Sequence, residues 1–269
     1  MKSSDLPASL SVAVSPCPND TFIFGAWILG AIPDLPDTCS RFTWKDVENL
    51  NTDARAGVFD VVKVSAAAAL DLQDSYTILR SGGAFGLQDG PKLVVRSGFA
   101  GPPRTVAVPG LQTTAMRILG AALPERFTPV PMQFDTIVPA LLSGEVDAGL
   151  LIHETALIYG EYGLDLLLDL GKWWRTKTSG KPLPLGCILA RNTLGAARIA
   201  GVEQQIRTSL ETARIDPAPV RPLLRSLAQE LDDTTLDRHI AAYVNEYSLD
   251  FGPEGEEALR LLNRIHRLR

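Results

Sequence analysis

Short buried runs of apolar residues alternate with helical stretches along most of this chain. Apolar runs that are too short for a helix predict strands within residues 10–14, 57–65, 92–96, 105–108, 148–152 and 187–191. Helices are predicted between them, at residues 21–29, 47–56, 66–72, 115–123 and 136–142. From Leu194 onward the pattern is helical, with breaks at Pro217, at Asp232 and near Gly252. Strands that alternate with helices are typical of an α/β fold.

Two parts of the pattern resemble each other and predict two lobes of similar build. Gly57-Val58-Phe59-Asp60 and Gly144-Glu145-Val146-Asp147 each precede a buried strand that stops at a polar residue. A segment rich in glycine and proline at residues 99–103 is typical of a linker. We therefore predict that lobe one contains residues 1–97 and 187–269, and that lobe two contains residues 98–186. The expected architecture has mixed sheets flanked by helices and a ligand cleft between the lobes.

Composition and charge narrow the classes of partner. The chain has 269 residues, of which 45% are hydrophobic, and a net charge of -5 without a basic block, which disfavours nucleic acid and anionic membranes as partners. Its three cysteines have neither metal-ligand spacing nor the even number of a disulfide framework. No signal-peptide core precedes the first strand, and no run approaches the roughly 18 apolar residues of a membrane span. We expect a cytoplasmic protein that acts on a small molecule without a metal or an organic cofactor.

The buried run at residues 148–152 ends at His153-Glu154, which is the first candidate for chemistry. The carboxyl ends of strands in open α/β sheets face the ligand crevice, and an imidazole exchanges protons near neutral pH. His153 is therefore a candidate general base, with a packed core histidine as the alternative. Its hydrogen-bond partner stays open between Glu154, a backbone carbonyl and another residue. His239 and His266 are interpreted as surface or packing histidines.

Polar residues at strand ends and helix starts predict the groups that hold the substrate. Lys63 is the only charge among the valines of residues 61–64, so its side chain either extends to the edge or, as we favour, meets an anion beside Ser65 and the next helix. Val64 belongs to the same segment. Thr113 and Thr114 supply two hydroxyls at a helix start, where capping needs only one. The predicted ligand is therefore a small-molecule carboxylate.

The loop Ser15-Pro16-Cys17-Pro18-Asn19-Asp20 carries further polar candidates. Its two prolines favour extended backbone, and Asn19 or Asp20 is placed to cap the following helix. Asn19 is equally a candidate substrate ligand. Cys17 is interpreted as part of the pocket wall and not as a nucleophile, because no cationic group near it in sequence would lower the pKa of its thiol.

These segments resemble those of a known enzyme family over nearly the whole chain. The resemblance rests on the run at residues 15–22, Arg80-Ser81-Gly82-Gly83, Thr113-Thr114, Ile152-His153-Glu154, Leu170-Gly171-x-Trp173-Trp174, Pro182-Leu183-Pro184-Leu185-Gly186 and Tyr243-Val244-Asn245. They look like the motifs of the 1,4-dihydroxy-6-naphthoate synthases of the futalosine route to menaquinone. The resemblance implies a two-lobed, periplasmic-binding-protein-like (type 2) α/β fold.

The resemblance also implies a reaction and roles for the site residues. The family's substrate is cyclic dehypoxanthine futalosine, which a lyase reaction without metal or organic cofactor converts into 1,4-dihydroxy-6-naphthoate and a sugar-derived fragment. The family's proton-accepting histidine falls on His153. Its substrate contacts fall on Lys63-Val64-Ser65 and on Thr113-Thr114.

Two alternatives share the expected fold. One is a cytosolic protein that binds a small organic anion without converting it. The other is the sister chorismate dehydratase of the same pathway, in which we expect neither the run at residues 15–22 nor the His153-Glu154 pair. The sequence favours the naphthoate synthase and leaves the oligomeric state open.

Overall fold

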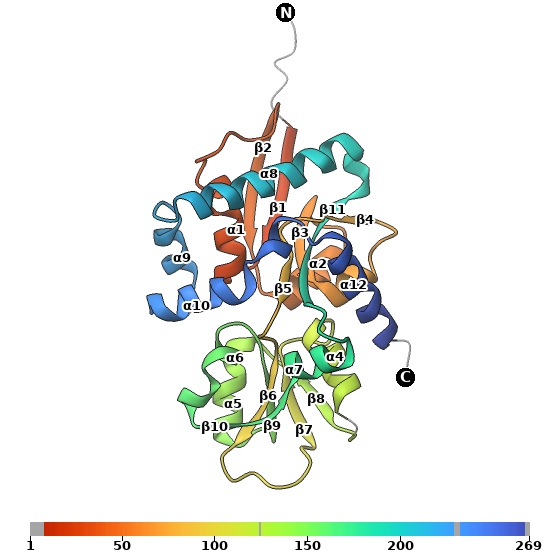
Figure 1. Ribbon diagram of the computed structural model, residues 1–269, viewed down its shortest axis with the longest axis vertical. Coiled ribbons are helices and arrows are strands. Elements are labelled where there is room, and N and C mark those ends of the chain that lie inside the picture. Colours follow the sequence, from red (N-terminus) through yellow and green to blue (C-terminus); the bar gives the residue numbers. More distant parts are fainter. Residues whose placement is uncertain (1–7, 124, 229–231, 267–269) are drawn as a thin grey trace, which may run out of the picture.

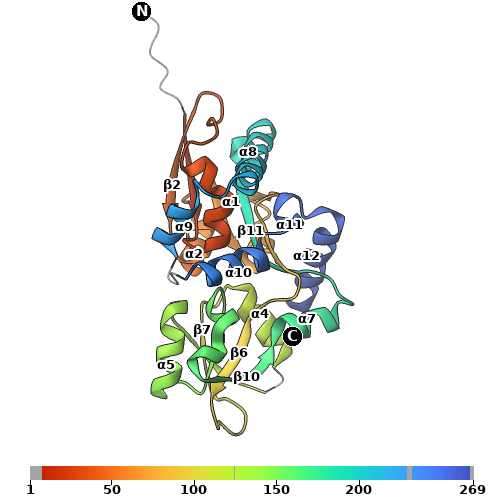
Figure 2. The ribbon, with the colours of Figure 1, turned by 60° about the vertical axis from the view of Figure 1, so that its left-hand side comes forward.

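The computed structural model describes residues 8–123, 125–228 and 232–266. Two α/β lobes follow each other along the long axis of the molecule (Figure 1), and a view turned by 60° shows the same division (Figure 2). Each lobe contains one mixed sheet with helices packed against it. This is the arrangement that the sequence pattern predicts.

The sheet of lobe one, sheet A, has the strand order β2-β1-β3-β11-β4, and β5 also pairs with β11. Its strands are β1 (Ala8–Val14), β2 (Thr38–Trp44), β3 (Val61–Ser65), β4 (Tyr76–Ile78), β5 (Ala84–Gly86) and β11 (Leu183–Arg191). β1, β2 and β3 are parallel, whereas β11 runs antiparallel to β3 and places Gly186 opposite Ser65. β3 is buried along its whole length because strands cover both its edges and helices cover its faces.

The sheet of lobe two, sheet B, has the strand order β10-β6-β9-β7-β8. Its strands are β6 (Lys92–Arg96), β7 (Thr105–Val108), β8 (Thr128–Pro131), β9 (Ala148–Leu151) and β10 (Leu164–Asp169). β7, β8 and β9 are parallel, and β6 runs antiparallel to β9 and β10.

The chain crosses between the lobes earlier than the expected boundaries at residues 97 and 186. β6, which the sequence pattern places in lobe one, pairs with β9 in sheet B, so the first crossing lies between Gly86 and Lys92. The return crossing lies before Leu183, where β11 already pairs with β5 in sheet A. The hydrophobic pattern predicts that a strand exists, but its lobe is decided by the strands to which it hydrogen-bonds.

The helices of lobe one cover sheet A, and those of lobe two cover sheet B (Figure 1). Those of lobe one are α1 (Pro18–Ile28), α2 (Val47–Arg55), α3 (Ala66–Leu70), η3 (Asn192–Leu194), α8 (Ala196–Ile215), α9 (Arg221–Leu227), α10 (Asp233–Tyr243), α11 (Glu246–Leu249) and α12 (Gly252–His266). Those of lobe two are α4 (Thr114–Ala122), η1 (Phe134–Thr136), α5 (Ile137–Ser143), α6 (Thr155–Ile158), η2 (Tyr159–Tyr162) and α7 (Leu170–Lys177). α1 packs against α8, α9 and α10, so the C-terminal helices complete the core of lobe one.

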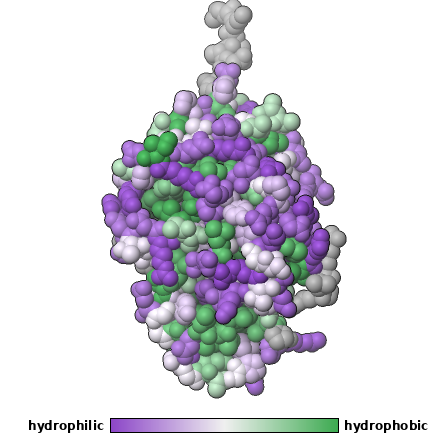
Figure 3. Space-filling view, in the orientation of Figure 1, coloured by the Kyte–Doolittle hydropathy of each residue, from purple (hydrophilic) through white to green (hydrophobic). Residues whose placement is uncertain are grey.

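One hydrophobic core continues through both lobes. Val64 of β3 and Leu189 of β11 belong to the same buried cluster as Val108 of β7 and Leu119 of α4. On the face drawn in Figure 3, hydrophobic residues form small groups among hydrophilic ones, one of them at the lower end. In the described part of the chain, no helix has the length and apolar character needed to cross a membrane.

Candidate active site

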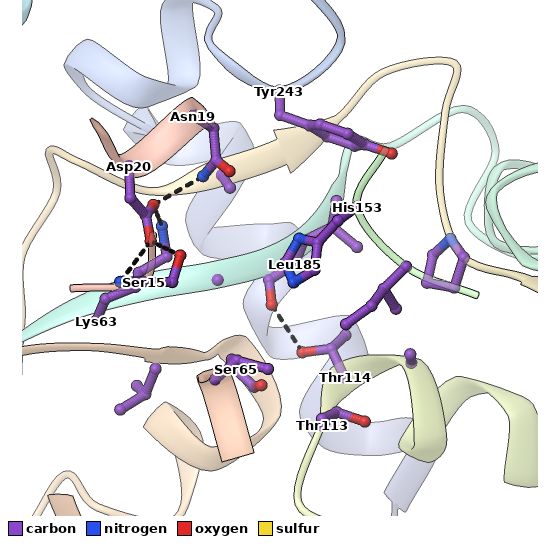
Figure 4. Close-up of a pocket in the computed structure, with 17 residues that line it drawn as sticks. Ser15, Asn19, Asp20, Lys63, Ser65, Thr113, Thr114, His153, Leu185 and Tyr243 are labelled. Carbon is purple, nitrogen blue, oxygen red and sulfur yellow. Dashed lines mark hydrogen bonds and ion pairs between the residues drawn. The ribbon is translucent and has the colours of Figure 1, made fainter. Parts of the chain in front are cut away.

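A cavity lies between the lobes, beside the carboxyl ends of β3 and β9 (Figure 4). The space between its lining atoms, open mouth included, is about 680 Å³, which is typical of sites for small molecules. All the residues for which we predict a role in binding or chemistry line this cavity: Asn19, Lys63, Val64, Ser65, Thr113, Thr114 and His153. Both lobes therefore contribute to one site.

His153 lies in a sharp turn that follows the end of β9 at Leu151. Its backbone has a φ of 55°, a left-handed conformation that histidine adopts more often than most residues. The imidazole lines the cavity, and the Phe134 ring meets it edge-on with 5.0 Å between the ring centroids. Since His153 and Glu154 belong to a turn and not to a strand, their side chains are free of the strand rule that would point them to opposite faces.

The imidazole of His153 is held in its neutral form. Burial, the largest effect, lowers its pKa to about 4 although the Glu154 carboxylate opposes the change, and the neighbouring His239 lowers this pKa further. As a whole residue His153 is half-buried, and it lines the cavity. At neutral pH, one ring nitrogen therefore carries a lone pair that can accept a proton.

Cys17 lies directly beside His153. Its sulfur is 3.4 Å from each of the two ring nitrogens, so the contact favours neither tautomer. Burial, and after it the charges of Glu154 and Asp20, raise the pKa of the Cys17 thiol well above its usual value. A thiol that stays protonated is a poor nucleophile, and this favours the interpretation of Cys17 as part of the wall around His153.

Lys63 meets an anion at the end of β3, but this anion belongs to the protein itself. Its ammonium forms a buried ion pair with Asp20, whose carboxylate also accepts hydrogen bonds from Ser15 Oγ at 2.6 Å and from Asn19 Nδ2 at 2.7 Å (Figure 4). The expectation that Asn19 or Asp20 caps the helix is wrong, because α1 already starts at Pro18 and both residues lie in its first turn. Proline is favoured at that first position.

The two threonine hydroxyls at the start of α4 already have partners. Thr113 caps the helix by accepting a hydrogen bond from the Met116 amide at 3.1 Å. Thr114 accepts from the Ala67 amide and donates to the Leu185 carbonyl, both at 3.0 Å, which joins α4 of lobe two to lobe one. An anion in the cavity would therefore meet the backbone amides of Thr114 and Ala115, which line the cavity and which the Thr113 cap leaves without a partner within the helix.

Ser65 offers a hydroxyl hydrogen to the cavity that it lines. The buried Asn51 fixes this residue, because its Oδ1 accepts from the Ser65 amide at 2.9 Å and its Nδ2 donates to Ser65 Oγ at 3.2 Å. Since the hydroxyl oxygen accepts this bond, its own O–H is available to donate to a ligand.

His239 lies next to the site, a position that the sequence pattern did not reveal, and of the two interpretations given for it, surface or packing, the surface one is wrong. It is fully buried, and its ring lies beside that of His153 with 6.3 Å between centroids. Its Nδ1 is 3.4 Å from Glu154 Oε2, and its Nε2 is 3.1 Å from Asn19 Oδ1. His239 therefore connects Glu154 in lobe two to α1 in lobe one.

The helical spacing of α10 holds the signal that would have found His239. Leu236, His239 and Tyr243 are three and four residues apart and share one buried face of the helix. Tyr243 lines the cavity and packs edge-on against His239.

The side chain of His266 lies outside the described residues. Within the described ranges, no group of three or more His, Cys, Asp or Glu side chains that could hold a metal ion occurs.

A family model and two similar proteins point to the same family. A family model described as menaquinone biosynthesis matches residues 10–267. The 1,4-dihydroxy-6-naphthoate synthase of Thermus thermophilus is 42% identical over 259 residues, which cover 94% of this chain and 92% of that protein. The protein of the same name from Streptomyces coelicolor is 40% identical over 263 residues, which cover 95% of this chain and 92% of that protein.

Solved structures agree on the fold. The crystal structure of a protein from Archaeoglobus fulgidus matches with a TM-score of 0.90 at 33% identity, covering 96% of this chain and 97% of that chain. The periplasmic aliphatic sulphonate-binding protein of Escherichia coli matches with a TM-score of 0.66 at 15% identity, covering 97% of this chain and 86% of that chain. The fold is thus periplasmic-binding-protein-like, as the resemblance of the sequence implies.

Proposed function

The chain belongs to the menaquinone biosynthesis family, and from this premise we propose that it is the lyase that converts cyclic dehypoxanthine futalosine into 1,4-dihydroxy-6-naphthoate. Two relatives that are 40–42% identical over nearly the whole chain carry the name of this synthase. The observation that carries the proposal is the neutral imidazole of His153 in a cavity formed by both lobes.

His153 acts as the general base. A neutral imidazole nitrogen in the cavity accepts a proton from the substrate, and the electron pair left behind drives the cleavage that releases the sugar-derived fragment. The carboxylate of a bound substrate adds negative charge to the cavity and raises the pKa of the imidazole in the complex, which makes it a stronger base than in the free enzyme. Glu154 stabilises the imidazolium that forms, because its carboxylate raises the pKa of His153.

The substrate is held by groups whose O–H or N–H can still donate a hydrogen bond to it. The Ser65 hydroxyl and the first amides of α4 bind its carboxylate, with Thr113 and Thr114 setting the position of those amides. Val64, together with Ile152 and Leu185, provides apolar wall for the ring system. Lys63 and Asn19 shape the opposite end of the cavity through their bonds to Asp20.

We expect the pH dependence of kcat/KM to report the low pKa of His153. A base works in its deprotonated form, so kcat/KM stays level as pH falls through 6.5 and declines only when pH approaches about 4. Below that value the decline is about tenfold per pH unit. The measurement is a pH series of kcat/KM, with circular dichroism at each pH to show that the protein is folded. An acid limb near the ordinary histidine value would contradict the buried, neutral state.

The Ser65→Ala variant is expected to raise KM by about tenfold with little change in kcat, the scale of one hydrogen bond to a charged ligand group. Ser143→Ala is a matched control, because its hydroxyl is exposed and donates to the Ala140 carbonyl on the surface of α5. Steady-state kinetics of both variants test the binding role. An unchanged KM in Ser65→Ala removes Ser65 from the substrate contacts.

The reaction itself is tested by incubating the purified protein with cyclic dehypoxanthine futalosine and following 1,4-dihydroxy-6-naphthoate by absorbance and mass. Formation of the naphthoate supports the proposal. Binding of the futalosine compound without product would indicate an organic-anion-binding protein of this fold. Dehydration of chorismate in a parallel assay would indicate the sister enzyme.

A further inference from the structure

His239 has four polar or aromatic neighbours, and the proposed reaction gives it no role of its own. Its imidazole is fully buried on α10, beside His153, with Nδ1 facing Glu154 and Nε2 facing Asn19. Polar groups with no access to water carry a high cost unless each has a partner of opposite hydrogen-bonding character. The positions of hydrogen atoms on this ring therefore follow from its neighbours.

The orientation of Asn19 fixes one of these hydrogens. Asp20 is paired with the Lys63 ammonium, so its carboxylate can only accept, and the Asn19 group that faces it at 2.7 Å must be the NH₂ donor. The carbonyl oxygen of Asn19 therefore faces His239 Nε2 at 3.1 Å, and an oxygen acceptor requires a hydrogen on that nitrogen.

A hydrogen on Nε2 leaves Nδ1 with a bare lone pair if the ring is neutral. That nitrogen lies 3.4 Å from Glu154 Oε2, within ion-pair distance although the two atoms are not aligned for an ideal hydrogen bond. Two lone pairs facing each other in a buried site repel, and a single additional proton between them removes the repulsion. The pKa of Glu154 agrees with a negatively charged carboxylate beside this proton. Burial alone would raise that pKa, but the interactions with His239 and His153 bring it below its usual value.

We infer that His239 and Glu154 hold one proton between them, and that this pair positions His153 and keeps it unprotonated until substrate binds. The inference rests on the proposed role of His153 as the base. His239 does not line the cavity, so it is a positioning residue that acts through its neighbour. A Glu154 carboxylate that is paired with His239 attracts a proton to His153 less strongly than an unpaired carboxylate would. The imidazole of His239, which is the positive partner of the pair, lies beside the His153 ring.

The charged and titratable groups around the two imidazole rings come from four parts of the chain. They are Cys17 and Asp20 at the start of α1, Lys63 of β3, Glu154 before α6, and Tyr243 of α10. Asp20 and Lys63 neutralise each other in their own ion pair. After burial, Glu154 therefore has the largest influence on the pKa of His153, and this influence depends on whether its carboxylate is paired.

The variant His239→Gln tests the pair through the pH profile. Glutamine keeps an amide that can donate to Asn19, but it cannot share a proton with Glu154. The acid limb of kcat/KM is expected to move upward from about 4 by about one pH unit or more, the effect of an unpaired charge at this range. In a Glu154→Gln background the same substitution moves the limb much less, because no carboxylate is released. A limb that does not move, or moves equally in both backgrounds, overturns the inference and leaves His239 as a packing residue.

Nuclear magnetic resonance of the ¹⁵N-histidine-labelled protein reads the same pair without turnover, since the chain has only three histidines to assign. The wild type is expected to show a downfield, slowly exchanging proton on His239 Nδ1 that Glu154→Gln loses. The titration of His153 moves upward in His239→Gln. If both signals are observed but the protein does not cleave cyclic dehypoxanthine futalosine, the His239–Glu154 pair is supported and the proposed function is refuted. Their absence from the wild type of an active enzyme would refute the pair alone, and Glu154→Gln supplies this test even if His239→Gln does not fold.

Discussion

Replacing His153 by asparagine is expected to lower kcat for cyclic dehypoxanthine futalosine by about 100-fold or more, the usual scale for loss of a general base. KM is expected to stay broadly unchanged, because the groups that we propose to bind the carboxylate lie on β3 and α4 and not on the histidine turn. Asparagine is the better probe than alanine, since it tolerates the left-handed backbone of residue 153, where φ is 55°. Steady-state kinetics and urea unfolding of the two proteins separate lost chemistry from lost folding.

Chemical rescue makes the test of His153 sharper. His153→Gly accepts the same backbone conformation and leaves space in the cavity for free imidazole, which should restore part of kcat in proportion to its concentration. Phe134→Leu is the control, because it alters the ring that contacts His153 edge-on without removing a titratable group. A fall in affinity with kcat retained would show that His153 binds the substrate and does not act as the base. Full activity of His153→Asn would end the proposal.

Much of the fold follows from the apolar pattern because that pattern is local. The strand that ends before His153, the helices after β3 and β7, and the breaks between the C-terminal helices all occur close to the predicted residues. The site residues then gather in one cavity for a general reason: carboxyl ends of strands and amino ends of helices face the same crevice in such folds. The strand ends in each lobe are therefore sufficient to predict that Ser65 and His153 line the same cavity.

The electrostatic partners could not be predicted, because they are set by contacts between residues far apart in sequence. Asp20 is 43 residues from Lys63, and His239 is 220 residues from Asn19. The sequence around Lys63 predicts an anion at the end of β3, but it does not show whether the protein or a substrate supplies that anion. Only the position of α1 beside β3, which brings Asp20 to Lys63, shows that the charge of Lys63 is already neutralised.

Lys63→Met is expected to lower the free energy of unfolding by about 3–5 kcal/mol, because it leaves Asp20 as a buried charge without its ion partner. The Lys63 and Asp20 side chains are only 6% and 1% exposed, so water cannot replace the lost ammonium. Asp20→Asn should have a cost of similar size. The double variant Lys63→Met/Asp20→Asn is expected to lose less than the sum of the two, since no uncompensated charge remains. Urea unfolding of the three variants measures these differences.

Lys45→Met provides the matched control for this cycle. Lys45 and Asp53 also form an ion pair, but their side chains are 40% and 19% exposed, so its loss should change stability by at most about 1 kcal/mol. The same comparison decides between the two roles considered for Lys63. If the ammonium were reserved for a substrate anion, Lys63→Met would raise KM strongly and leave the unfolding curve almost where it was. The opposite result is a large loss of stability in Lys63→Met that the double variant relieves. It would show that Lys63 acts on the site indirectly: Lys63 fixes Asp20, Asp20 holds the Asn19 NH₂ group, and the carbonyl oxygen of Asn19 then faces His239.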